Sequence, residues 1–216
     1  MEVNERRTQR ERSESTRAAL IAAARPLFAA HGFAGVGTEA IVQAAGVTRG
    51  AMYHQFADKV EVFAAVFEAV EEEMTERVLA RAAGADTSTR AGTLEVVEAG
   101  IAAWLDACAE PGIQRIVLVD APAVLGWQRW REVGLRHAVG LIEAVVAEAV
   151  AAGVVQPLPV RAVTHVVVGA LEEAALYVAS SDPGSTARAE VDTVLGRLLA
   201  GLFVEEPPAA GRTVEQ

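Results

Sequence analysis

Residues 38–56 read TEAIVQAAGVTRGAMYHQF, and this stretch decides the fold of the N-terminal part of the chain. It predicts two short helices, residues 38–45 and 49–55, because Thr38 and Thr48 can cap their starts. Gly46 lies between them, and glycine accepts the left-handed backbone conformation that a tight turn requires. The apolar side chains expected to pack inward beneath the turn are Ile41, Val47 and Met52. This pattern is typical of a helix-turn-helix, in which the second helix lies in the major groove of DNA.

The outward side chains of the second helix suit contact with DNA. Arg49 can make a bidentate contact with guanine, and Gly50 lets the helix approach closely. Side chains at helix starts are expected to face the phosphate backbone, which positions the protein rather than reading bases. The candidate DNA-contacting residues are Thr38, Thr48, Arg49, Gly50, Tyr53, His54 and Lys59. Taken alone, the turn leaves open an ordinary helical hairpin with a glycine bend.

A helix is predicted before this unit, over residues 13–31. Its apolar residues at helical spacing are Leu20, Ile21, Ala24, Leu27 and Phe28. Gly32 supplies a left-handed stop, and Pro26 is expected to kink the helix.

A long helix is predicted after the unit, over residues 58–83. Asp58 and Glu61 have the spacing of a capping box, with Asp in the usual Ser or Thr position. Its apolar face is formed by Phe63, Val66, Phe67, Val70, Met74 and Val78. The three glutamates at 71–73 are interpreted as a solvated helix face.

Together these segments resemble the N-terminal domain of the tetracycline-repressor (TetR) family. The resemblance rests on FAAHGF at 28–33, the pattern T-x-x-I-x-x-x-A-G-V-T-R-G-A-M-Y-H-Q-F at 38–56, and D-K-x-x-V-F at 58–63. It covers about residues 13–62, and Val42 departs from the alanine that the family more often has. It implies an N-terminal three-helix helix-turn-helix domain followed by a C-terminal helical bundle for ligand binding and dimerisation. It also implies that the seven candidate residues occupy the family's DNA-contacting positions.

Composition agrees with an all-α fold, since 52% of the 216 residues are apolar and alanine, the best helix former, is abundant. The net charge of −10 is unevenly distributed. Residues 1–60 carry eight Lys and Arg against six Asp and Glu, whereas the remainder carries eleven against 23. Such asymmetry indicates one end that faces nucleic acid. Residues 1–12 form an expected basic arm, although a solvated, frayed terminus would have the same composition.

Several other classes of protein are disfavoured. Residues 35–40 match the dinucleotide pattern G-x-G-x-x-A, but helix-forming residues precede them where that motif requires a strand. No common hydrolase, phosphate-loop or di-iron motif occurs, so we expect no enzyme, no catalytic residues, no metal and no cofactor. Cys108 is the single cysteine and is expected to be a small core residue. No membrane-spanning run and no signal peptide are recognised, which predicts a soluble cytoplasmic protein.

The polar segment 84–90 is the candidate linker to the C-terminal helices. Those helices are predicted over residues 91–109, 113–125, 128–152, 160–180 and 187–203. The predicted division is a DNA-binding domain over 13–60, a ligand-binding and dimerisation domain over 61–204, and a disordered tail over 205–216. The last two helices are amphipathic and are expected to form an intersubunit four-helix bundle, although both faces could instead fill the domain's own core.

Aromatic side chains with a few polar anchors are candidates for a ligand pocket. The candidate ligand-binding residues are Trp104, Asp120, Trp127, Trp130, His137, His165, Glu173 and Tyr177. Each of them could equally be an ordinary core residue. Apolar and aromatic walls favour a hydrophobic or amphipathic small molecule.

These observations predict a ligand-responsive homodimeric repressor bound to a palindromic, double-stranded DNA operator. A small-molecule effector would shift helix 58–83, interpreted as the only connection between pocket and DNA reader, and release the operator. The alternative is a helical small-molecule-binding or interaction protein without sequence-specific DNA regulation.

Overall fold

The computed structural model describes residues 9–182 and 184–204, which are helical throughout apart from short connections. The basic arm is therefore described only from residue 9, where it forms the first turn of a helix, and the tail 205–216 lies outside the described residues. In order, the helices are α1 (Gln9–Gly35), α2 (Thr38–Ala45), α3 (Arg49–Gln55), α4 (Lys59–Ala82), α5 (Arg90–Ala109), α6 (Pro111–Gln114), the π-helix η1 (Arg115–Asp120), α7 (Ala121–Ala151), α8 (Val160–Ser180) and α9 (Ala187–Ala200). Among these residues there is no strand, only an isolated bridge between Val155 and Phe203.

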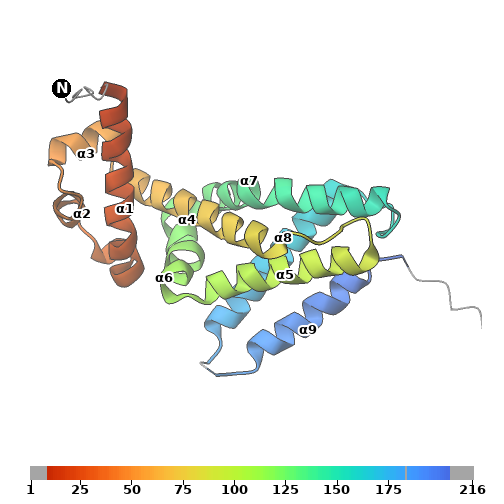
Figure 1. Ribbon diagram of the computed structural model, residues 1–216. Coiled ribbons are helices and arrows are strands. Elements are labelled where there is room, and N and C mark those ends of the chain that lie inside the picture. The colour runs from red at the N-terminus through yellow and green to blue at the C-terminus, as the bar shows by residue number, and fades with distance from the viewer. Residues whose placement is uncertain (1–8, 183, 205–216) are drawn as a thin grey trace, which may run out of the picture.

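The first three helices gather at one end of the molecule, and α4 leads from them into a bundle with α5, α7, α8 and α9 (Figure 1). Gly46 ends α2 in the left-handed conformation, with φ of 66°, as the sequence predicted. Thr48 caps α3 by accepting a hydrogen bond from Ala51 N at 3.1 Å. Ile41 and Met52 are fully buried beneath this turn. The helix-turn-helix and the all-α fold are confirmed.

The break in α1 lies at Gly32, as the sequence predicted, whereas the kink expected at Pro26 is absent because the backbone there keeps helical geometry. Gly32 has φ of 69° and ψ of 168°, and it is the residue within α1 whose backbone departs from helical geometry. Glycine tolerates this left-handed φ, so the helix ends here in practice and the next residues turn toward α2. The ring of Phe28, just before the break, meets that of Phe63 on α4 edge-on, at 5.2 Å between centroids. This aromatic contact joins α1 to the long helix.

The segment between α5 and α7 differs from the single helix predicted over residues 113–125. It consists of α6, one turn of π-helix and the start of α7. Helix α7 extends to Ala151 but is kinked at Gly126, whose φ is 78°. A π-helix holds an extra residue per turn and often occurs at functional sites. Here it lies where the bundle meets the helix-turn-helix end of the molecule.

By length and composition alone, α1 and α8 could cross a membrane. In the structure α1 packs against α2, α3 and α4, and α8 packs against α5, α7 and α9. Both helices are thus parts of folded helical units.

Candidate DNA-binding surface and ligand cavity

The exposed face of α3 carries five of the seven candidate DNA-contacting residues. These exposed residues are Thr48, Arg49, Gly50, Tyr53 and His54. The Arg49 guanidinium lies over the Tyr53 ring, 5.5 Å from its centroid, and donates to Glu39 Oε1 at 3.0 Å. Stacking and pairing hold two long side chains in place on the outer surface. Thr38 is half-buried at the start of α2, next to Glu39.

Lys59 is half-buried and differs from the others because its ammonium group is engaged inside the protein. Its Nζ donates to the carbonyl oxygens of Phe33 and Val36, each at 2.9 Å, and lies 4.0 Å from the Phe33 ring centroid. These carbonyl groups follow the break in α1, and that of Phe33 also accepts from Val36 N at 3.4 Å. The sequence suggested a phosphate contact at this position and gave no indication of this internal role.

The helices of the C-terminal part enclose a cavity of about 170 Å³. Its walls are mostly apolar side chains from α4, α5, α7, α8 and the end of α9, with Val117 and Leu118 of η1 at one side. Trp104, Trp130 and His137 of the candidate ligand-binding residues line it. Trp130 is fixed there because its Nε1 donates to the Val117 carbonyl at 3.0 Å.

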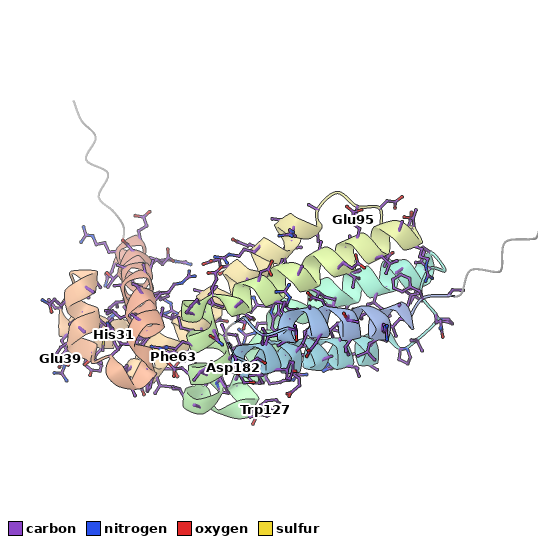
Figure 2. All side chains as sticks on the ribbon, turned by 90° about the horizontal axis from the view of Figure 1, so that it is seen from below. His31, Glu39, Phe63, Glu95, Trp127 and Asp182 are labelled. Carbon is purple, nitrogen blue, oxygen red and sulfur yellow. The ribbon has the colours of Figure 1, made fainter. Side chains whose placement is uncertain are left out.

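The other five candidates do not line this cavity. Trp127 follows the kink at Gly126 and is 65% exposed (Figure 2). Tyr177 faces outward and donates to Glu190 at 3.1 Å, Glu173 is exposed, and His165 is half-buried outside the lining. Asp120 instead accepts a hydrogen bond from Phe33 N.

Two glutamates that sequence reasoning did not select line the cavity. Glu71, interpreted from the sequence as solvated, is only 8% exposed, and burial together with the charge of Glu172 raises its pKa to about 7. Burial also raises the pKa of Glu172, although its ion pair with Arg131 opposes this shift. The signal for Glu71 was its helical phase, because it follows Phe67 by four residues and precedes Met74 by three on the apolar face.

A second connection joins the cavity to the helix-turn-helix end, so the interpretation of α4 as the only connection was wrong. Val117 and Leu118 in the middle of η1 face the cavity. At the ends of η1, Arg115 donates to the Ala30 carbonyl at 2.7 Å and Asp120 accepts from Phe33 N at 2.7 Å. One short π-helix therefore contacts both the cavity and the end of α1.

On the α4 side, Arg129 of α7 forms a paired contact with Glu61, at 2.6 and 2.9 Å. This ion pair lowers the pKa of Glu61. It fixes the start of α4, next to Lys59, against the bundle. Among the described residues no group of three or more His, Cys, Asp or Glu could hold a metal ion.

Comparisons with known proteins agree with this architecture. The profile described as "Bacterial regulatory proteins, tetR family" matches residues 20–66, and "Tetracyclin repressor-like, C-terminal domain" matches residues 94–202. The HTH-type transcriptional regulator CymR of Pseudomonas putida is 46% identical over 78 residues, which are 36% of this chain and 38% of that regulator. The chain thus matches well under two thirds of that relative's length.

Among solved structures, a TetR-family transcriptional regulator from Pectobacterium atrosepticum is 35% identical, with a TM-score of 0.78, over 93% of this chain and 100% of that chain. The structure of RolR in complex with resorcinol has a TM-score of 0.70 at 19% identity, covering 88% of this chain and 90% of that one, and shows likeness of fold alone. Matches to both halves of the chain, together with the helix-turn-helix, identify this protein as a transcriptional regulator of the TetR family.

Proposed function

We propose that this regulator is a homodimeric repressor that leaves its palindromic operator when a small apolar or amphipathic molecule fills the C-terminal cavity. The observation that carries the proposal is the shared position of η1, which lines the cavity and holds the end of α1. A molecule that displaces Val117 or Leu118 would move Arg115 and Asp120 with them, because one turn of helix joins the four residues. Binding of the ligand would then weaken binding of DNA, and the reverse, with a coupling free energy that is typically about 1–3 kcal/mol.

Exposed apolar residues on the last two helices support the dimer. Val194 and Leu198 of α9 are 55% and 62% exposed, and Val166 of α8 is 72% exposed. Val191 and Leu195, on the same amphipathic helix, are instead buried in the subunit's own core. Large apolar side chains left in water on neighbouring helices favour a second copy as their partner. Two recognition helices would enter successive major grooves about 34–36 Å apart.

Arg49 is proposed to read a base, while Thr38, Thr48, Tyr53, His54 and Lys59 contact or position the backbone, and Gly50 allows close approach. The acidic C-terminal part would stay clear of the phosphates. The site of action is the cytoplasm, where the operator is. RolR, a protein of the same fold, was solved in complex with the ligand resorcinol, which supports a ligand of about one ring for this chain.

The test is fluorescence anisotropy of the purified protein with DNA from upstream of its own gene and with a scrambled control, at two salt concentrations. We expect a preference of roughly 10³-fold or more for the native DNA, with two subunits per site. Arg49→Ala should lose discrimination at one base pair while keeping most of the salt dependence. Equal, weak binding to every genomic fragment in a selection experiment would instead indicate a helical binding protein without DNA regulation.

A further inference from the structure

Most polar side chains that line the cavity already have partners. Thr75 and Thr93 donate their hydroxyl groups to backbone carbonyls of the chain, at 2.8 and 2.9 Å. Glu172 accepts from Arg131, so its charge is balanced within the protein. These groups contribute to folding and have little free capacity to bind a ligand.

Two titratable side chains in the cavity wall, those of Glu71 and His137, each have an unpartnered polar group within the described residues. The carboxyl group of Glu71 is almost fully buried, and no hydrogen bond or ion pair to it is found among residues 9–182 and 184–204. The Nε2 atom of His137 is buried and has no hydrogen-bond partner in the same part of the chain. A buried polar group without a partner is costly, and native proteins rarely retain one without a reason. A ligand that pairs with both groups would remove that cost.

The charged residues of the cavity wall indicate whether that ligand is a cation or an anion. The described residues that line the cavity include two carboxyl groups and neither a lysine nor an arginine. Because Arg131 balances Glu172, Glu71 is the carboxylate whose charge is not opposed. An anionic ligand would meet this carboxylate without a cation to bind it, whereas a cation would supply the missing opposite charge.

We propose that the effector is an organic cation with an apolar body of about one ring and a protonated amine that pairs with Glu71 and donates to His137 Nε2. The inference rests on the proposed function, since it names the chemical class of effector for the same cavity. The size follows from the volume: an apolar cavity of roughly 150 Å³ admits benzene, so about 170 Å³ suits one ring. Trp104 and Trp130 supply aromatic faces for the ligand body or the cation.

Binding of such a cation should release a proton. With a pKa of about 7, Glu71 carries a proton in about half of the empty molecules at pH 7. A nearby ammonium favours the carboxylate form, so the proton passes to the buffer as the ion pair forms. Released protons change the heat of binding in proportion to the ionisation enthalpy of the buffer, which makes the event measurable.

The experiment compares three probes of similar size on the full-length protein without DNA: 2-phenylethylamine, 2-phenylethanol and 3-phenylpropionate. Isothermal titration calorimetry at pH 7, in phosphate and in Tris, gives affinity and proton release, and quenching of tryptophan fluorescence reports on the cavity. We expect the amine to bind at least about tenfold more tightly than the alcohol, and the acid most weakly. Only the amine should release protons, about 0.5 per site.

Glu71→Gln keeps the shape of the side chain and removes its charge, so it should abolish both the preference for the amine and the proton release. Glu72→Gln is the matched control, because Glu72 is exposed on the same helix. Equal binding of amine and alcohol, tighter binding of the acid, or no binding of the amine would each overturn the inference. None of these results affects operator recognition, which the anisotropy experiment measures separately, so the two proposals fail independently.

Discussion

Asp120 Oδ2 accepts a hydrogen bond from Phe33 N at 2.7 Å, which joins two residues 87 positions apart in the chain. Phe33 directly follows the break at Gly32, where its N–H has lost its helical partner. The carboxylate therefore caps α1 from another part of the protein. Since Asp120 is the last residue of η1, this bond and that of Arg115 to the Ala30 carbonyl together tie η1 to the end of α1.

Asp120→Ala should lower the free energy of unfolding by about 1–3 kcal/mol, because it leaves the Phe33 N–H without an acceptor. Operator affinity should fall as well, since the end of α1 loses one of its fixed contacts. Asp120→Asn retains an acceptor oxygen and should lose less. Urea denaturation and operator anisotropy measure the two effects. Asp182→Ala, at an exposed aspartate between α8 and α9, is the control and should change neither quantity. Unchanged stability in Asp120→Ala would show that the Asp120 carboxylate does not stabilise the end of α1.

Lys59→Ala should destabilise the protein by about 1–2 kcal/mol, because the carbonyl groups of Phe33 and Val36 lose a charged donor. Both the melting temperature and the affinity for DNA should fall, the latter because the helix-turn-helix is displaced. Tyr53→Ala, which removes an exposed side chain of α3, should weaken DNA binding with little change in melting. Melting curves and the salt dependence of operator binding separate the two roles. A normal melting temperature with a salt slope flattened by about one would identify Lys59 as a phosphate contact only.

Leu198→Glu should separate the dimer into monomers, since the two-fold axis places two new charges in one apolar interface. We expect the dissociation constant of the dimer to rise by roughly a hundredfold. Sedimentation velocity over a range of protein concentrations measures it. Leu79→Glu, at an apolar residue of α4 that is 48% exposed, provides the comparison and should remain dimeric. A dimeric Leu198→Glu protein would place the interface elsewhere.

Stability should depend on pH through Glu71. Its pKa is about 7 in the folded protein against an ordinary value of 4.5, so the folded state binds the proton more tightly than the unfolded state. Below about pH 4.5 Glu71 is protonated in both states and does not lower the free energy of unfolding. That free energy falls as pH rises from about 4.5 through 7, where only the unfolded state readily releases the proton. The decrease approaches something on the order of 3 kcal/mol at full ionisation. Glu71→Gln should remove it and be more stable than the wild type at pH 8.

The measurement is chemical denaturation of both proteins from pH 5 to pH 8 at one protein concentration, with the difference between them as the readout. Groups that do not interact with Glu71 cancel in that difference, whereas Glu172 and Cys108 interact electrostatically with Glu71, so the difference reports on Glu71 together with its coupling to them. A difference independent of pH would mean that Glu71 is ionised at all these values.

The N-terminal half was predictable because local signals there agree with one another. Gly46 and Thr48 define the turn from adjacent residues, and Ile41 and Met52 are buried as their spacing predicted. The course of α1 also depends on local residues. The chain changes direction at Gly32, which adopts a positive φ, while the backbone at Pro26 remains helical.

The cavity was harder to predict, because helical phase decides which side chains face inward. Glu172 faces the cavity and its neighbour Glu173 faces water, one residue apart. Trp127 and Trp130 are three residues apart and their ring centroids lie 4.9 Å from each other, yet Trp130 lines the cavity and Trp127, which directly follows the kink at Gly126, is 65% exposed. The π-helix could not be predicted either, since its extra residue per turn depends on contacts made by Arg115 and Asp120 with distant parts of the chain.

Cys108 is the only cysteine of the chain, it is buried in the core, and burial raises the pKa of its thiol. A buried thiol of that kind reacts slowly with maleimides and methanethiosulfonates. The wild-type chain is therefore a ready background for site-directed spin labelling. One new thiol on the outer face of α2, such as Gln43→Cys, would place a single label on each chain. In the proposed dimer, pulsed electron paramagnetic resonance would then measure the distance between the two helix-turn-helix units directly as a candidate effector is added.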